Sequence, residues 1–298
     1  MPALPLKRRR RIALGAVSVV GLTTAAGWAT AARASAGGNL PRVVSVGGAL
    51  TEIVFRLGAE SLLVGTDTTS VYPEAAEATP KVGYARALSA EGVLSLRPTV
   101  VIASAEAGPP TVIAQLRDAG VMVIRAVPGH DVEALLRNVR LVAAAVERAT
   151  AGEALAASLQ RQWQAVQSRV RRKGLAPRVL FVLSHAANNV QVSGGGTAAH
   201  ALIAAAGGAN AMSGFDGYRP LTAEAVLAAA PEAILTTVQG LKALGGEQRL
   251  LAGQPGLALT PAGRAQRVLA RDALYLLGGG PRMPEAVRDV ATFLGTFA

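Results

Sequence analysis

Short apolar runs alternate with helical patterns along most of the chain. Such runs, without polar alternation, are typical of strands covered on both faces of a parallel sheet. Apolar residues at helical spacing predict helices directly after residues 47–48, at about 111–119, and through 131–173 with a boundary near 151–152. Strands that alternate with helices indicate an α/β fold. The predicted strands are residues 42–46, 62–65, 99–103, 121–124, 179–183 and 233–237.

One segment of the chain is repeated. Residues 88–102 align without a gap with residues 221–235, and each copy has a Ser or Thr N-cap, a short helix, a proline turn and a strand. The simplest account is two Rossmann-like α/β lobes, each with a central parallel-rich sheet, joined by one long helix that runs from about Gly152 to Arg172. A ligand would then lie between the lobes, where loops at strand ends converge. The predicted divisions are a first lobe at 41–150, a connecting helix at 151–175 and a second lobe at 176–298.

The first 36 residues have the pattern of a signal peptide. The basic residues 7–11 precede 21 uncharged residues, 12–32, and residues 34–36 have the small-x-small pattern that signal peptidases cleave. Cleavage would leave a mature protein in the periplasm, exported by the Sec or the twin-arginine (Tat) route. An uncleaved membrane anchor is the alternative, although glycine and threonine reduce the apolarity of this stretch.

The composition of the chain excludes several kinds of site and partner. The chain has no cysteine, which excludes disulfides, thiolate metal sites, iron–sulfur clusters and cysteine nucleophiles. Six basic residues of the predicted signal account for much of the net charge of +11, so the mature chain is only mildly positive. This balance suits an anionic ligand better than a nucleic-acid backbone, and we expect no nucleic-acid partner.

Motifs of catalysis are also missing from the sequence. The glycine-rich residues 193–197 lack the Gly-Lys-Ser/Thr ending of a phosphate-binding loop. No spacing specifies a triad of serine, histidine and acid. We therefore expect a protein that is not an enzyme, and a secreted hydrolase is the less favoured alternative from another class.

Several motifs together resemble a known family. They include Gly-Gly-Ala-Leu-Thr-Glu at residues 47–52, the two repeated Ser/Thr-x-Glu-x-Val-Leu helix starts, and a single connecting helix. These resemble the class III solute-binding proteins of ABC importers, which serve cobalamin, siderophores and haem. Further segments are similar to the haem-binding branch of that family, namely residues 82–98, 183–185, 196–200, 207–210, 255–263 and 280–282.

The resemblance implies a function for the whole chain. A monomeric periplasmic protein would capture haem between its lobes and deliver it to an inner-membrane ABC permease dimer with its ATPase. A carrier of ferric siderophores or corrinoids on the same scaffold is the competing hypothesis.

Haem chemistry narrows the candidate ligands to tyrosine, histidine and methionine, because there is no cysteine. Tyr84 lies between Gly83 and a helix start, which suits a loop position facing the ligand. The resemblance implies that Tyr84 binds the haem iron and that Arg86 supports it, through the phenolate oxygen or a propionate. A half-buried tyrosine that packs on the next strand is the alternative.

Candidates in the second lobe are less specific. His185 follows the strand 179–183, where some haem-binding relatives use a histidine, and a histidine with no iron contact is an equal alternative. Lys242, in a glycine-flanked segment, is a candidate for the haem propionates, although a solvated lysine is nearly as plausible. Tyr218 is a candidate wall of the cleft. We expect structural or packing roles for His130, His200, Tyr72 and Tyr275.

Two glutamates occupy the same place in the two copies of the repeat. Glu91 and Glu224 are each the third residue of a Ser/Thr-x-Glu helix start, where an acid complements the helix dipole by about 0.3–1 kcal/mol. That local effect alone would explain their presence. In the resembled family the matching glutamates dock onto the permease, so the resemblance implies a docking role for both.

Overall fold

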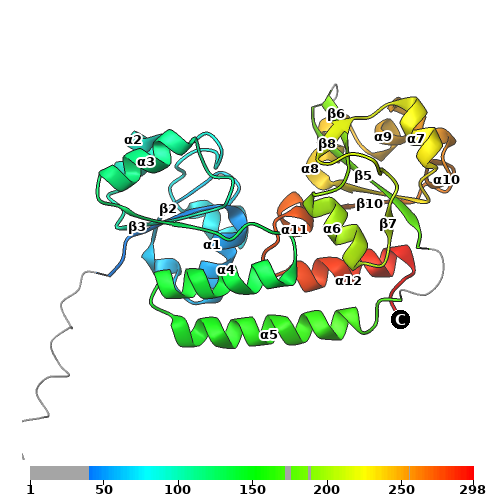
Figure 1. The fold of residues 1–298 in the computed structure, drawn as a ribbon. Helices are drawn as coiled ribbons and strands as arrows, with labels where there is room; N and C mark the ends of the chain where they lie inside the picture. Colours follow the sequence, from blue (N-terminus) through cyan, green and yellow to red (C-terminus); the bar gives the residue numbers. More distant parts are fainter. Residues whose placement is uncertain (1–39, 172–175, 187–188, 255) are drawn as a thin grey trace, which may run out of the picture. The chain divides into compact units, whose positions relative to one another are not determined.

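Two β-sheets organise the chain (Figure 1). The computed structural model describes residues 40–171, 176–186, 189–254 and 256–298, so the predicted signal peptide lies outside the described residues. Contacts group Pro41–Ala298 into one unit that contains both sheets. The α/β fold with two parallel-rich sheets is therefore confirmed.

The first sheet is entirely parallel, with strand order β2-β1-β3-β4. Its two central strands are completely buried, as their apolar runs predict. The last strand lies at the sheet edge, and Met122 at its start is 60% exposed. The prediction of burial on both faces is wrong for this strand, because its residues are exposed or half-buried at every position. The strands are β1 (Val43–Val46), β2 (Leu63–Thr66), β3 (Val100–Ala103) and β4 (Met122–Arg125).

The second sheet is mixed, with strand order β10-β9-β5-β6-β8, and β7 pairs with β5. Pairing is parallel among β5, β7, β9 and β10, whereas β6 joins β5 and β8 in antiparallel fashion. The strands are β5 (Arg178–Ala186), β6 (Asn189–Ser193), β7 (Ala209–Asn210), β8 (Tyr218–Pro220), β9 (Ala233–Thr237) and β10 (Val268–Arg271).

Helices cover both faces of each sheet. Apolar clusters lie on the two faces of the first sheet and on the two faces of the second. The helices that precede the second sheet are α1 (Gly48–Arg56), α2 (Ala90–Leu94), α3 (Pro110–Asp118), α4 (Val132–Ala145) and α5 (Ala149–Gln167). Those that follow are α6 (Ala198–Ala205), α7 (Ala223–Ala229), α8 (Val238–Leu244), α9 (Glu247–Gly253), α10 (Pro261–Arg264), α11 (Ala273–Leu277) and α12 (Met283–Leu294). Short 3₁₀ turns are η1 (Glu60–Leu62), η2 (Glu74–Ala78) and η3 (Leu257–Leu259).

The longest described helix, α5, connects the two sheets in sequence. Figure 1 shows it alongside α4 and α12, and Trp163 packs against the apolar clusters of both sheets. It begins and ends several residues earlier than the expected span 152–172. The break before it comes at residues 146–148 rather than 151–152, because Glu147 adopts a left-handed conformation with φ of 57°. None of the described helices is both long and apolar enough to cross a membrane.

Candidate ligand-binding site

Tyr84 projects from a loop whose backbone is held on both sides. The Thr68 N–H donates to the carbonyl of Gly83 (2.9 Å), and the Ala87 N–H donates to the carbonyl of Tyr84 (2.8 Å). Gly83 has φ of 100°, a conformation that favours glycine. The Tyr84 side chain is 48% exposed, and its hydroxyl has no hydrogen-bond partner among the residues that the structure describes. The loop thus presents a free phenol oxygen on a fixed backbone.

The positive charge of Arg86, on the Tyr84 loop, acts on Tyr218 of the second sheet. Burial raises the pKa of Tyr218, and the positive charge of Arg86 opposes that rise. The guanidinium of Arg86 therefore lies within electrostatic reach of the Tyr218 phenol, which comes from β8 of the second sheet.

The segments that carry Tyr84 and Tyr218 resemble each other, and the gapless alignment of the repeat does not show this. Gly217 and Tyr218 precede the helix start at Thr222 much as Gly83 and Tyr84 precede the one at Ser89. Both glycines have positive φ, 100° and 78°. One residue fewer separates the second tyrosine from its helix, so a gapless alignment of the repeat ends before reaching it.

Lys242 and His185 are not joined to this site by any described contact. Lys242 is exposed in the last turn of α8 and forms no ion pair within the described ranges. His185 lies inside β5 rather than after it, and its side chain lies outside the described residues. The roles expected for both residues stay predictions.

The two repeated helix starts have the expected N-caps. The Ser89 hydroxyl accepts from the Gly92 N–H, and the Thr222 hydroxyl accepts from the Ala225 N–H, each at 3.3 Å. The predicted glutamates lie in the first turns of α2 and α7, and both are exposed.

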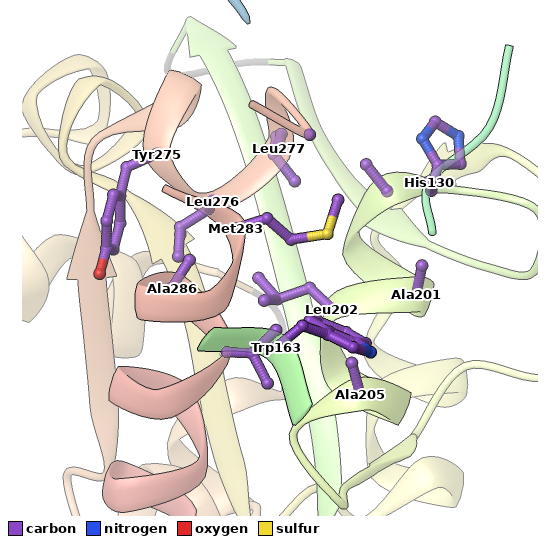
Figure 2. Close-up of a pocket in the computed structure, with 13 residues that line it drawn as sticks. His130, Trp163, Ala201, Leu202, Ala205, Tyr275, Leu276, Leu277, Met283 and Ala286 are labelled. Atoms are coloured by element: carbon purple, nitrogen blue, oxygen red, sulfur yellow. The ribbon is translucent and has the colours of Figure 1, made fainter. Parts of the chain in front are cut away.

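A small apolar pocket lies among α5, α6, α11 and α12, and Figure 2 shows Trp163, Met283 and His130 among its lining residues. Its volume is about 30 Å³, which is enough for ordered water but not for a large ligand. A tetrapyrrole or siderophore does not fit in such a space. His130 therefore belongs to a minor cavity and not to a main ligand site.

The remaining histidine and the two remaining tyrosines differ in setting. His200 lies on α6, with its Nδ1 3.4 Å from the amide nitrogen of Asn210. The Tyr275 hydroxyl donates to Asp289 (3.0 Å), and burial and this carboxylate raise its pKa, which agrees with the expected packing role. Tyr72 is 42% exposed, so the packing prediction holds only for part of its ring.

Glu52 and Arg282 form an ion pair that the sequence does not reveal. The Arg282 Nε donates to Oε2 of Glu52 (3.0 Å), and only 2% of the Glu52 side chain is exposed. Burial raises the pKa of Glu52, and the charge of Arg282 opposes the rise. The guanidinium also lies 3.6 Å from the centre of the Tyr72 ring. Because the two residues are 230 positions apart, no periodicity in the sequence pairs them.

Comparison with known proteins identifies the scaffold. The family model described as periplasmic binding protein matches residues 43–274. The chain belongs to the periplasmic binding protein family. Members of this family and the similar structures are binding proteins rather than enzymes, in agreement with the expectation from sequence.

Two solved structures are similar to this periplasmic binding protein over most of its length. The haem-binding protein BhuT, in complex with two haems, is 52% identical with a TM-score of 0.81, over 85% of this chain and 97% of that chain. The haem-binding protein RhuT from Roseiflexus sp. RS-1, in apo form, is 42% identical with a TM-score of 0.83, over 86% of this chain and 98% of that chain.

A vitamin B12-binding protein from Salmonella typhi is also related. It is 28% identical over 198 residues, which are 65% of this chain and 71% of that protein. The proteins similar to this chain thus include haem-binding proteins and a vitamin B12-binding protein.

Proposed function

We propose that the protein is a periplasmic solute-binding protein that captures haem between its lobes and delivers it to an inner-membrane ABC importer. The observation that carries this proposal is the free, half-exposed phenol of Tyr84 on a loop clamped at both ends. The fold of the chain and its similarity to the haem-binding proteins BhuT and RhuT also support haem as the ligand. The lobes in this proposal are residues 41–150 and 176–298, with the connecting helix at 151–175.

Tyr84 would bind the ferric iron through its phenolate oxygen. A hard anionic oxygen is a suitable axial ligand for ferric haem. Arg86 would donate to that oxygen or to a propionate, in either case through a charge-assisted hydrogen bond. Tyr218 would form the opposite wall, since it lies within electrostatic reach of Arg86. Lys242 would serve as a point charge for the second propionate.

His185 would hold a second haem. The complex of BhuT with two haems makes this a specific hypothesis for the second lobe. Native mass spectrometry with hemin tests it, because His185→Ala should then lower the count from two to one. One haem in both proteins would return His185 to a structural role.

Export and docking complete the proposal. Residues 1–36 would act as a signal peptide for the Sec or Tat route, and the mature monomer would work in the periplasm.

Glu91 and Glu224 would dock onto the permease dimer, whose ATPase drives uptake. Their exposure at matched helix starts supports this role, because charged groups at the surface steer and orient association.

The test is a titration with hemin followed by absorption. Wild-type protein should give a saturable, shifted Soret band, and Tyr84→Phe should lose that spectrum and bind at least about tenfold more weakly. Tyr72→Phe is a matched control, because its ring is exposed to a similar degree, 42% against 48%, and it should behave as wild type.

A corrinoid carrier is the second candidate, and the vitamin B12-binding relative favours it. Cyanocobalamin and a ferric siderophore should be titrated in parallel. Tight binding of either one, with no response to hemin, would contradict the haem assignment and leave the carrier fold intact.

A further inference from the structure

We propose that Asp67 and Lys81 are positioning residues for Tyr84. The two side chains and the residues that they bind, here called the Asp67–Lys81 network, fix the segment from which the tyrosine projects. The inference rests on the proposed function, because it concerns the residue that would bind the haem iron.

Asp67 is a completely buried carboxylate that follows β2 directly. Its Oδ1 accepts from the Gly47 N–H (2.9 Å) and from the Ser70 hydroxyl (2.7 Å). Its Oδ2 accepts from the backbone N–H (3.1 Å) and the hydroxyl (2.6 Å) of Thr69. Four donors compensate for the burial of the carboxylate and attach this loop to the start of α1.

Lys81 holds the same loop from the other side. Its ammonium donates to the Thr66 hydroxyl (2.9 Å), to the carbonyl of Ser70 (2.9 Å) and to the carbonyl of Ala76 (3.0 Å). All three of its donors are used. Desolvation lowers the pKa of Lys81, and the nearby charge of Asp67 opposes this change. Because Ser70 contacts both charged residues, the contacts form one network.

The network reaches Tyr84 through the backbone. Thr66 and Lys81 form a parallel β-bridge, which places the segment before the tyrosine beside the end of β2. The Thr68 N–H then donates to the carbonyl of Gly83, directly before Tyr84. The chain that enters Tyr84 is therefore held by the segment that the network anchors.

Rigid support of this kind matters for a metal ligand. An iron–oxygen bond is short and directional, so a small displacement of the phenol weakens it. Loss of an outer partner of a metal ligand typically lowers metal affinity about 10–100-fold. The Tyr84 hydroxyl has no partner of its own among the described residues, so its position depends on the backbone that carries it.

The test compares Asp67→Asn and Lys81→Met with wild type. Both variants should release hemin about tenfold faster, and the phenolate-to-iron charge-transfer band should shift or broaden. Lys81→Arg should restore both properties, because it keeps a charged donor group. Lys81 lies at the surface, so Lys81→Met keeps the test valid even where Asp67→Asn folds poorly.

Asn138→Leu is the control for a general loss of stability. Asn138 also anchors a loop beside the first sheet, by accepting from the Val127 N–H (2.7 Å) and donating to its carbonyl (3.1 Å). This variant should lose thermal stability and keep the wild-type spectrum and release rate.

The inference would be overturned if folded Lys81→Met and Asp67→Asn showed the wild-type spectrum and the wild-type rate of hemin release. It would also be overturned if Asn138→Leu changed both properties as much as these variants do. If wild-type protein takes up no hemin, the proposed function itself fails, and this inference fails with it.

Discussion

At the scale of single residues, the candidate site depends on which polar groups have partners. The phenol of Tyr275 is bound to Asp289, whereas that of Tyr84 has no partner within the described part of the chain. Apolar patterning by itself does not separate these two tyrosines, because both lie near apolar segments. The motif around Tyr84 selects it, and the hydrogen bonds of the structure explain why its oxygen is available.

Arg86→Ala should raise the pKa of Tyr218 further. The positive charge of Arg86 favours the phenolate form of Tyr218, so its removal leaves burial unopposed. Tyrosinate absorbance followed against pH measures the change, and Tyr218→Phe identifies the signal that belongs to this residue. An unchanged titration would mean that the two residues do not share a site.

At the scale of elements, apolar runs predicted the positions of strands β1, β2, β3, β4, β5 and β9 to within a few residues. The short strands β7 and β8 have two and three residues, too few to form a pattern. The break between α4 and α5 was misplaced, because a left-handed Glu147 leaves no mark in the apolar spacing. Apolar runs therefore predict where the longer strands lie better than they predict short strands or the ends of helices.

Packing of α4 on α5 allows a direct test. A Cβ atom at Gly152 would lie 2.3 Å from the Cβ of Ala143, so Gly152→Ala forces the helices apart. We expect a loss of about 1–3 kcal/mol in the free energy of unfolding, measured by denaturant. Gly253→Ala, also in a helix but with no atom within 4 Å of the added methyl, should lose no stability and should gain up to about 1 kcal/mol from the higher helix propensity of alanine. Equal effects would argue against close packing of these helices.

At the scale of the whole molecule, contacts other than α5 also join the two lobes. The ion pair between Glu52 and Arg282 links α1 with the start of α12. In the sequence, Glu52 and Arg282 stand out only as parts of two separate motifs, residues 47–52 and 280–282. Their pairing depends on the tertiary fold, which explains why the sequence does not reveal it.

Glu52→Gln should change how stability depends on pH. Burial raises the folded-state pKa of Glu52 above its ordinary value of 4.5, so the folded state binds this proton more tightly than the unfolded state. The contribution of Glu52 to stability therefore falls as pH rises from about the ordinary value through the raised one. Denaturation of both proteins at several pH values should give a wild-type advantage that grows on acidification. An advantage that grows with rising pH would mean that the ion pair outweighs burial.

The combined variant Glu91→Ala with Glu224→Ala should abolish haem uptake in cells. Both side chains are exposed, so we expect folding and hemin affinity to stay at wild-type values. Transport assays with the importer, together with hemin titration of the purified variant, measure the two properties separately. Normal uptake would leave the helix dipole as the only role of these glutamates.

Resonance Raman spectroscopy of the hemin complex tests the central claim most directly, because vibrations of an iron-bound phenolate identify the ligand. We expect these bands in the wild-type complex and in Tyr72→Phe, and their loss in Tyr84→Phe. Phenolate bands that persist in Tyr84→Phe, or a wild-type spectrum without them, would contradict the assignment of Tyr84 as the iron ligand.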